Sequence, residues 1–117
     1  MSPADYLATL AEPTRLRVLA CLAATPLYVS DLVEILNLPQ PTVSRQLRVL
    51  RTLGLAVDRR ASTRIAYHLT LPPGPLGRMV RGVLHALQSD PAFRADRAAA
   101  RERAGSRQPR PHSVHAS

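Results

Sequence analysis

The segment Gln40–Leu53 constrains the fold more than any other part of this sequence. Its large apolar residues recur at positions i, i+4, i+7 and i+10, which lie on one face of a helix: Val43, Leu47, Leu50 and Leu53. The other faces carry Thr, Ser, Gln and Arg side chains. Pro41 suits the first helical position, with Gln40 before it as a weak cap. Such a helix can pack on a core with one face and meet nucleic acid with the other, so we predict a recognition helix.

Three shorter helices are expected before this segment. Ser2 is placed to cap the first, Pro13 begins a second that runs to about Ala24, and Ser30 caps a third that ends at Leu36. The extended piece 27–29 lies between the second and third helices and can pair at the edge of a small sheet. The third helix and a short turn therefore come directly before the recognition helix.

A hairpin is expected after the recognition helix. Gly54 ends that helix as a left-handed residue, and residues 55–60 and 64–69 form two strands joined by residues 61–63. Arginines flank the tip of this hairpin. The predicted fold is mainly α with a small β-hairpin, in the order of a winged helix-turn-helix.

The C-terminal third should begin with a helix for dimer formation. After the rigid break Pro72–Pro75, apolar residues return at helical spacing over a wide arc: Leu76, Met79, Val80, Val83, Leu84 and Leu87. We expect a homodimer through the terminal helices, although packing of this arc on the chain's own core stays open. The expected division is residues 1–89 for DNA binding and dimerisation, 90–104 as a C-terminal helix whose packing is open, and 105–117 as a disordered tail.

Composition favours a polyanionic partner and argues against other classes. The formal net charge is +8, and all 16 basic residues counted as Lys+Arg are arginine, whose planar fork suits phosphates and guanine edges. A GC-rich genome could produce the same bias. No targeting segment, membrane-length apolar run or catalytic motif occurs, and there is one cysteine. We therefore expect a cytoplasmic protein that is not an enzyme, has no cofactor and does not contact a membrane.

Five motifs occur in order between residues 4 and 88: Leu10–Leu19, Val29–Leu32, Gln40–Leu47, Leu50–Leu55 and Tyr67. Together they resemble the ArsR (arsenic repressor) family of bacterial regulators. The resemblance implies a homodimeric winged-helix repressor that binds a palindromic operator in double-stranded DNA and releases it when an effector binds. Two positions depart from the family pattern, because Pro39 replaces a capping Ser and Ser62 replaces the Gly of the hairpin turn.

The resemblance also assigns candidate DNA contacts by position. In the recognition helix and the hairpin, these residues are Gln40, Thr42, Ser44, Arg45, Gln46, Arg48, Arg59, Arg60 and Arg64. Arg45 or Gln46 would reach base edges, while Thr42 and Ser44 would hold phosphates, and Arg48 suits a backbone contact or a solvated face. Arg59, Arg60 and Arg64 would meet phosphate or the minor groove.

The effector is left unknown by the sequence. The family's Cys-Val-Cys-Asp-Leu metal signature is replaced by Tyr28–Leu32, and the terminal helix offers only His85, so no metal site is expected. Cys21 is either a buried structural thiol or, with a partner from elsewhere, a sensor. His112 and His115 have metal-ligand spacing, but they fall in the expected tail.

A second function class stays open beside the repressor. The winged helix would then serve protein contacts or general nucleoid binding, without an effector. If residues 91–104 pack on the dimer, an effector pocket between them and the first helix is a further possibility.

Overall fold

Six helices and one small sheet make up residues 1–107, the part of the chain that the computed structural model describes. The helices are α1 (Pro3–Leu10), α2 (Pro13–Ala24), α3 (Val29–Leu36), α4 (Gln40–Thr52), α5 (Gly74–Leu87) and α6 (Pro91–Arg107). The strands are β1 (Leu27–Tyr28), β2 (Ala56–Ala61) and β3 (Arg64–Leu69), in the antiparallel order β1-β3-β2. This is the winged helix-turn-helix arrangement that the sequence predicts. Within residues 1–107, no helix combines the length and apolarity needed to cross a bilayer.

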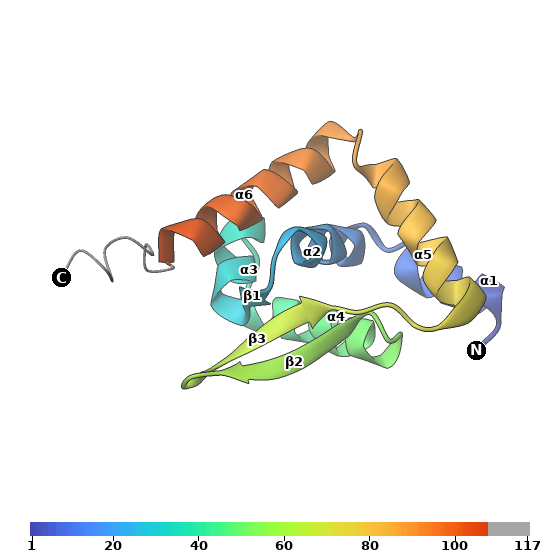
Figure 1. Cartoon of the computed structure of the whole chain (residues 1–117), viewed down its shortest axis with the longest axis horizontal. Helices are drawn as coiled ribbons and strands as arrows, with labels where there is room; N and C mark the ends of the chain where they lie inside the picture. The colour runs from blue at the N-terminus through green and yellow to red at the C-terminus, as the bar shows by residue number, and fades with distance from the viewer. Residues whose placement is uncertain (108–117) are drawn as a thin grey trace.

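Helix α2 lies at the centre of the molecule, and every other layer is arranged around it. Figure 1 shows α4 and the β2–β3 hairpin below α2, and α5 and α6 as an arch above it. Val18, Leu19 and Leu22 of α2 are buried, and they share one core with Val43 and Leu47 of α4. The predicted apolar stripe of α4 therefore packs inward, which leaves its other face to solvent.

Local hydrogen bonds determine where the helices begin. The predicted caps of α3 and α4, Ser30 and Gln40, are both wrong. Ser2 caps α1 as expected, since its Oγ accepts from the Asp5 backbone N–H at 3.1 Å. Helix α3 begins at Val29, so Ser30 lies in its first turn; Asp31 bonds the Tyr28 N–H instead, at 2.8 Å. A carboxylate there also suits the positive end of the helix dipole.

Helix α4 begins one residue earlier than its proline suggested. Gln40 is its first residue rather than its cap, and the cap position is Pro39, which makes no side-chain bond. The Pro39 carbonyl accepts the N–H groups of Thr42 and Val43 at 3.0 and 3.2 Å. At the other end, Gly54 follows the helix with φ of 76°, the left-handed conformation predicted for it.

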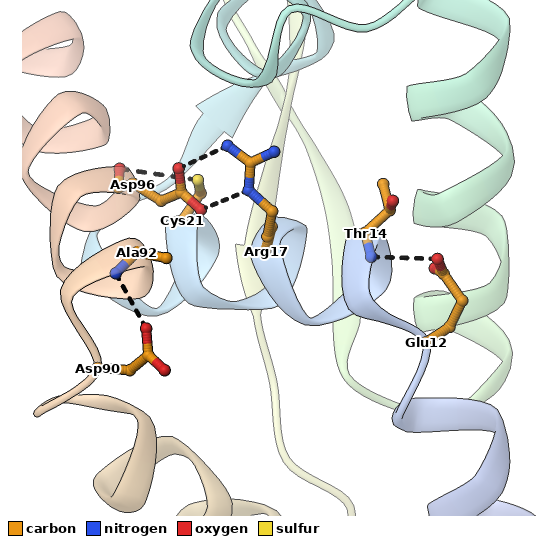
Figure 2. A network of polar contacts seen from close by, with 7 residues as sticks. All are labelled: Glu12, Thr14, Arg17, Cys21, Asp90, Ala92 and Asp96. Atoms are coloured by element: carbon orange, nitrogen blue, oxygen red, sulfur yellow. Dashed lines mark hydrogen bonds and ion pairs between the residues drawn. The ribbon is translucent and has the colours of Figure 1, made fainter.

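Helix α6 packs on α2 and α3 through two ion pairs with buried carboxylates. Arg17 Nε and Nη2 donate to the two oxygens of Asp96 at 2.8 and 2.9 Å, as Figure 2 shows. Arg103 Nε donates to Asp31 at 2.8 Å. Both carboxylates are almost fully buried, so losing either arginine would remove the ion pair of a buried charge. Small side chains, Ala100 and Ala104, complete the contact.

The position of α6 changes two expectations for the C-terminal region. The helix continues to Arg107, so residues 105–107 are helical rather than part of a disordered tail, while residues 108–117 lie outside the described part. The suggested pocket between this region and the first helix is not supported, since α6 packs on α2 and α3 and Figure 1 places α1 at the far end of the molecule.

Two glycines of α5 provide a test of how this helix is seated. A methyl group on Gly77 would fall well inside van der Waals contact with the Pro72 carbonyl oxygen, whereas one on Gly82 would meet nothing within 4 Å. We expect Gly77→Ala to lower the free energy of unfolding by ~1–3 kcal/mol through overpacking. Gly82→Ala, the matched control, should raise it by ~0.5–1 kcal/mol through helix propensity. Urea titrations of the two variants measure both changes, and equal effects would contradict this packing.

Candidate nucleic-acid interface

The outward face of α4 carries polar and basic side chains over its whole length. Gln40, Arg45 and Arg48 are exposed, while Thr42 and Ser44 are half-buried at the edge of the helix. Gln40 Nε2 donates to Ser44 Oγ one turn later, at 3.3 Å. The structure thus brings together, on one accessible surface, most of the groups expected to contact DNA on this helix.

Gln46 does not belong to that surface. It is 9% exposed, Arg15 Nε donates to its Oε1 at 3.0 Å, and its Nε2 donates to Glu12 Oε2 at 3.3 Å. Its position three residues after Val43 and four before Leu50 places it on the inward stripe. The base-reading role suggested for Gln46 is therefore not supported, because both ends of its amide are already bonded to α2 and to the cap residue of α2.

Glu12 and Arg15, which the sequence did not single out, complete this network. The Glu12 carboxylate caps α2 by accepting the N–H groups of Thr14 and Arg15 at 3.1 and 2.9 Å; Figure 2 shows the bond to Thr14. Burial alone would raise the pKa of Glu12, but these N–H bonds and the Arg15 charge lower it below its ordinary value. Arg15 Nη1 also donates to the Thr9 carbonyl, so the network ties α1 to α4.

All three predicted arginines of the hairpin are exposed, but only Arg64 is also held by contacts to another element. Arg59 and Arg60 are exposed on β2, close to a turn in which Ser62 has φ of 62° in place of the family's glycine. Arg64 is held differently. Its guanidinium lies 3.8 Å from the centroid of the Tyr28 ring, and its Nη2 donates to Ser30 Oγ at 2.6 Å. Arg64 thus braces the hairpin against the start of α3, which argues against a primary phosphate contact.

The surface between α4 and the hairpin is strongly positive. Six arginines and one acid, Asp58, occur between residues 45 and 64. That acid pairs with Arg51 at 3.3 Å, and both side chains are partly exposed. Pairs of this kind contribute little to stability, but here the pair neutralises the one local negative charge.

Helix α5 buries only part of its apolar arc within the chain. Val80 is fully buried in the core, which removes it from the set expected at a dimer interface. Leu76, Met79 and Leu84 pack on the core but stay half-buried, as do Val83 and Leu87. The arc therefore packs partly on the chain's own core. Five of its six residues keep exposed surface that a second copy could cover.

Cys21 is a buried thiol in the core between α2 and α6. Its side chain is fully buried and its Sγ lies 3.8 Å from the Asp96 carbonyl oxygen, as drawn in Figure 2. Burial, with the nearby Asp96 charge, raises the pKa of Cys21 to about 12. Within residues 1–107, no three potential ligand side chains gather as a metal site, and His112 and His115 lie outside this range. These features favour a structural thiol over a sensor.

Comparison with known proteins gives a consistent pattern. Residues 12–57 match the model of a family described as bacterial regulatory protein, arsR family. The chain is 50% identical over 66 residues to the HTH-type transcriptional regulator NmtR of Mycobacterium tuberculosis, and 39% identical over 67 residues to the biofilm growth-associated repressor of Xylella fastidiosa. The matches cover 56% and 57% of this chain, and 55% and 59% of those proteins. The chain thus spans little more than half the length of these relatives.

A solved structure extends the likeness beyond the matched family segment. The crystal structure of the transcriptional repressor BigR from Xylella fastidiosa superposes with a TM-score of 0.62 at 31% identity, covering 78% of this chain and 84% of that one. The family segment runs from Glu12 to the first residues of β2. It contains the helix-turn-helix and the hydrogen bonds among Glu12, Arg15 and Gln46.

Burial of Cys21 predicts slow chemistry at its sulfur. At neutral pH the folded protein should react with a thiol reagent far more slowly than protein unfolded in guanidinium, because little thiolate exists and the sulfur is enclosed. Absorbance after adding an aromatic disulfide reagent measures both rates. A native rate equal to the unfolded rate would show that the thiol is accessible and restore Cys21 as a candidate sensor.

Proposed function

This chain belongs to the arsR family of bacterial regulatory proteins, and from that premise we propose that it is a dimeric repressor that binds a palindromic DNA operator through α4. One observation carries the proposal. The exposed face of α4 carries Gln40, Arg45 and Arg48 and lies beside a hairpin with exposed arginines. The one acid between residues 45 and 64 is paired with an arginine. Such a face has the size and charge to enter a major groove.

The two parts of this surface have different proposed tasks. Arg45, in the first half of α4, is placed to read a base edge, with Gln40 beside it. Thr42, Ser44 and Arg48 hold phosphates, which set position and orientation without reading sequence. Arg59 and Arg60 make the corresponding backbone or minor-groove contacts from the hairpin.

The half-buried arc of α5 supports the dimer in this proposal. A second copy would cover Leu76, Met79, Val83, Leu84 and Leu87, which the chain itself covers only in part. A two-fold dimer presents two copies of α4, so its operator has two half-sites related by the same symmetry. Analytical ultracentrifugation at several protein concentrations gives the stoichiometry directly.

We also propose that an effector releases the protein from DNA. Several relatives are named repressors, and the family resemblance implies that an effector weakens DNA binding. Neither the buried Cys21 nor the family's cysteine signature supplies that signal here. A ligand other than a thiolate-bound metal is therefore the proposed effector class.

Two arginine variants separate base reading from phosphate binding. We expect Arg45→Ala to reduce discrimination between operator and scrambled DNA by ~1–3 kcal/mol, because a bidentate base contact is lost. Arg60→Ala should weaken binding to both DNAs about equally and make the salt dependence less steep. Gel-shift titrations on the protein's own promoter region, at several salt concentrations, measure both effects.

Wild-type protein on the same DNAs is the reference for this test. If it binds promoter and scrambled DNA equally, the sequence-specific repressor is wrong and a general nucleoid-binding module is favoured. If Arg60→Ala changes base preference more than Arg45→Ala does, the tasks assigned to α4 and the hairpin are reversed.

A further inference from the structure

A cavity of about 250 Å³ lies where α2, α5, α6 and the end of β3 meet. Leu69, Leu84 and Leu87 give it apolar walls, and Arg81 and Arg97 bring positive charge to it from α5 and α6. It is separate from the DNA-facing surface of α4. Its lining residues include no acid, so these guanidinium groups have no counter-charge within the cavity.

Arg97 carries a hydrogen-bond donor that its surroundings do not use. Its Nε is buried, and within the described residues it has no hydrogen-bond partner. Buried donors in folded proteins nearly always have a partner, so one without a partner needs an explanation. A guanidinium offers parallel N–H groups that match the two oxygens of a carboxylate. The missing partner is a hydrogen-bond acceptor, and the two guanidinium groups with no acid in the lining favour an anionic one.

We propose that this cavity binds a small organic carboxylate. The carboxylate would pair with Arg97 and Arg81, with His85 and Gln88 as further polar neighbours, and the short apolar body would lie against the leucines. The cavity is smaller than the ~300–1,000 Å³ of sites for drug-sized ligands. If each non-hydrogen atom takes about 30 Å³, as water does in the liquid, roughly eight atoms fit. Hexanoate has this size and chemistry.

A larger groove is a weaker candidate for such a ligand. It has a volume of about 720 Å³ and lies along α3, β3 and the end of α6. Its two arginines are already engaged, Arg64 with Tyr28 and Ser30, and Arg103 with Asp31. Glu34 also lines it and would repel an anion. A guanidinium with an unused donor in the smaller cavity is the more specific signal.

A ligand in this cavity could alter DNA binding by changing the geometry of the dimer. The cavity separates the second half of α5 from α2, so a ligand there would fix the angle between the proposed dimer helix and the helix on which α4 packs. Changing that angle changes the distance between the two α4 helices of a dimer. This regulatory step rests on the proposed function, whereas ligand binding itself does not.

Binding is tested first without DNA. Isothermal titration of the full chain with sodium hexanoate, hexanamide and sodium sulfate separates carboxylate recognition from apolar binding and from simple anion binding. We expect one hexanoate per chain, and at least about tenfold weaker binding of hexanamide and sulfate, because only hexanoate uses both parts of the cavity.

Four variants locate the site. Arg97→Gln should weaken hexanoate binding about tenfold or more, and Arg81→Gln, at an exposed position that tolerates substitution, should also weaken it. Arg78→Gln on α5 and Arg101→Gln on α6 remove the same charge from the same helices outside this cavity and should leave binding unchanged. Absent binding, equal affinity for hexanamide, or equal losses in all four variants would overturn the proposal.

A gel shift with and without hexanoate then tests the regulatory step. We expect hexanoate to weaken promoter binding by the wild type and by Arg78→Gln, but not by Arg97→Gln. Calorimetric binding without any effect on a specific DNA complex would disprove the coupling alone. Failure of the wild type to bind its promoter specifically would instead disprove the proposed function.

Discussion

The placement of α4 depends on a polar residue buried in its apolar face. Gln46, which is 9% exposed, bonds half-buried Arg15 and Glu12 through both ends of its amide. An unsatisfied buried amide group costs ~1–3 kcal/mol, whereas apolar contacts alone tolerate small rotations of a helix. The network therefore selects the placement of α4 in which Arg45 and Arg48 face outward. Leucines hold the helix on the core, and Gln46 determines its rotation.

The same physical pattern recurs where α1, α3 and α6 join the centre of the fold. The Tyr6 hydroxyl donates to the Leu53 carbonyl at 2.7 Å and links α1 to the end of α4. Asp31 and Asp96 are buried on α3 and α6, and each is paired with an arginine on another helix. The core is small and consists mainly of leucine, whose apolar contacts are non-directional, so these directional contacts are important. The exposed arginines are then left for a partner, and the unpaired Arg97 Nε is an exception to the pattern.

Periodicity predicted the elements of this fold, but it could not predict partners distant in sequence. The stripe of α4, the left-handed Gly54 and the hairpin follow from local spacing, and all three are found. Gln46 was expected on the DNA side because a polar side chain gave no sign that Glu12, 34 residues earlier, would bond it. The contacts of Arg64 to Tyr28 and Ser30 could not be predicted for the same reason, since they arise only when β3 meets α3.

A double-mutant cycle between Glu12 and Gln46 tests most directly whether this network positions the recognition helix. Promoter and scrambled-DNA affinities would be measured for wild type, Glu12→Ala, Gln46→Ala and the double variant. We expect each single change to weaken binding to both DNAs by a similar factor, with a coupling of ~0.5–3 kcal/mol in the cycle. Strictly additive losses, or a change in base preference caused by Gln46→Ala alone, would contradict a positioning role and return Gln46 to the reading surface.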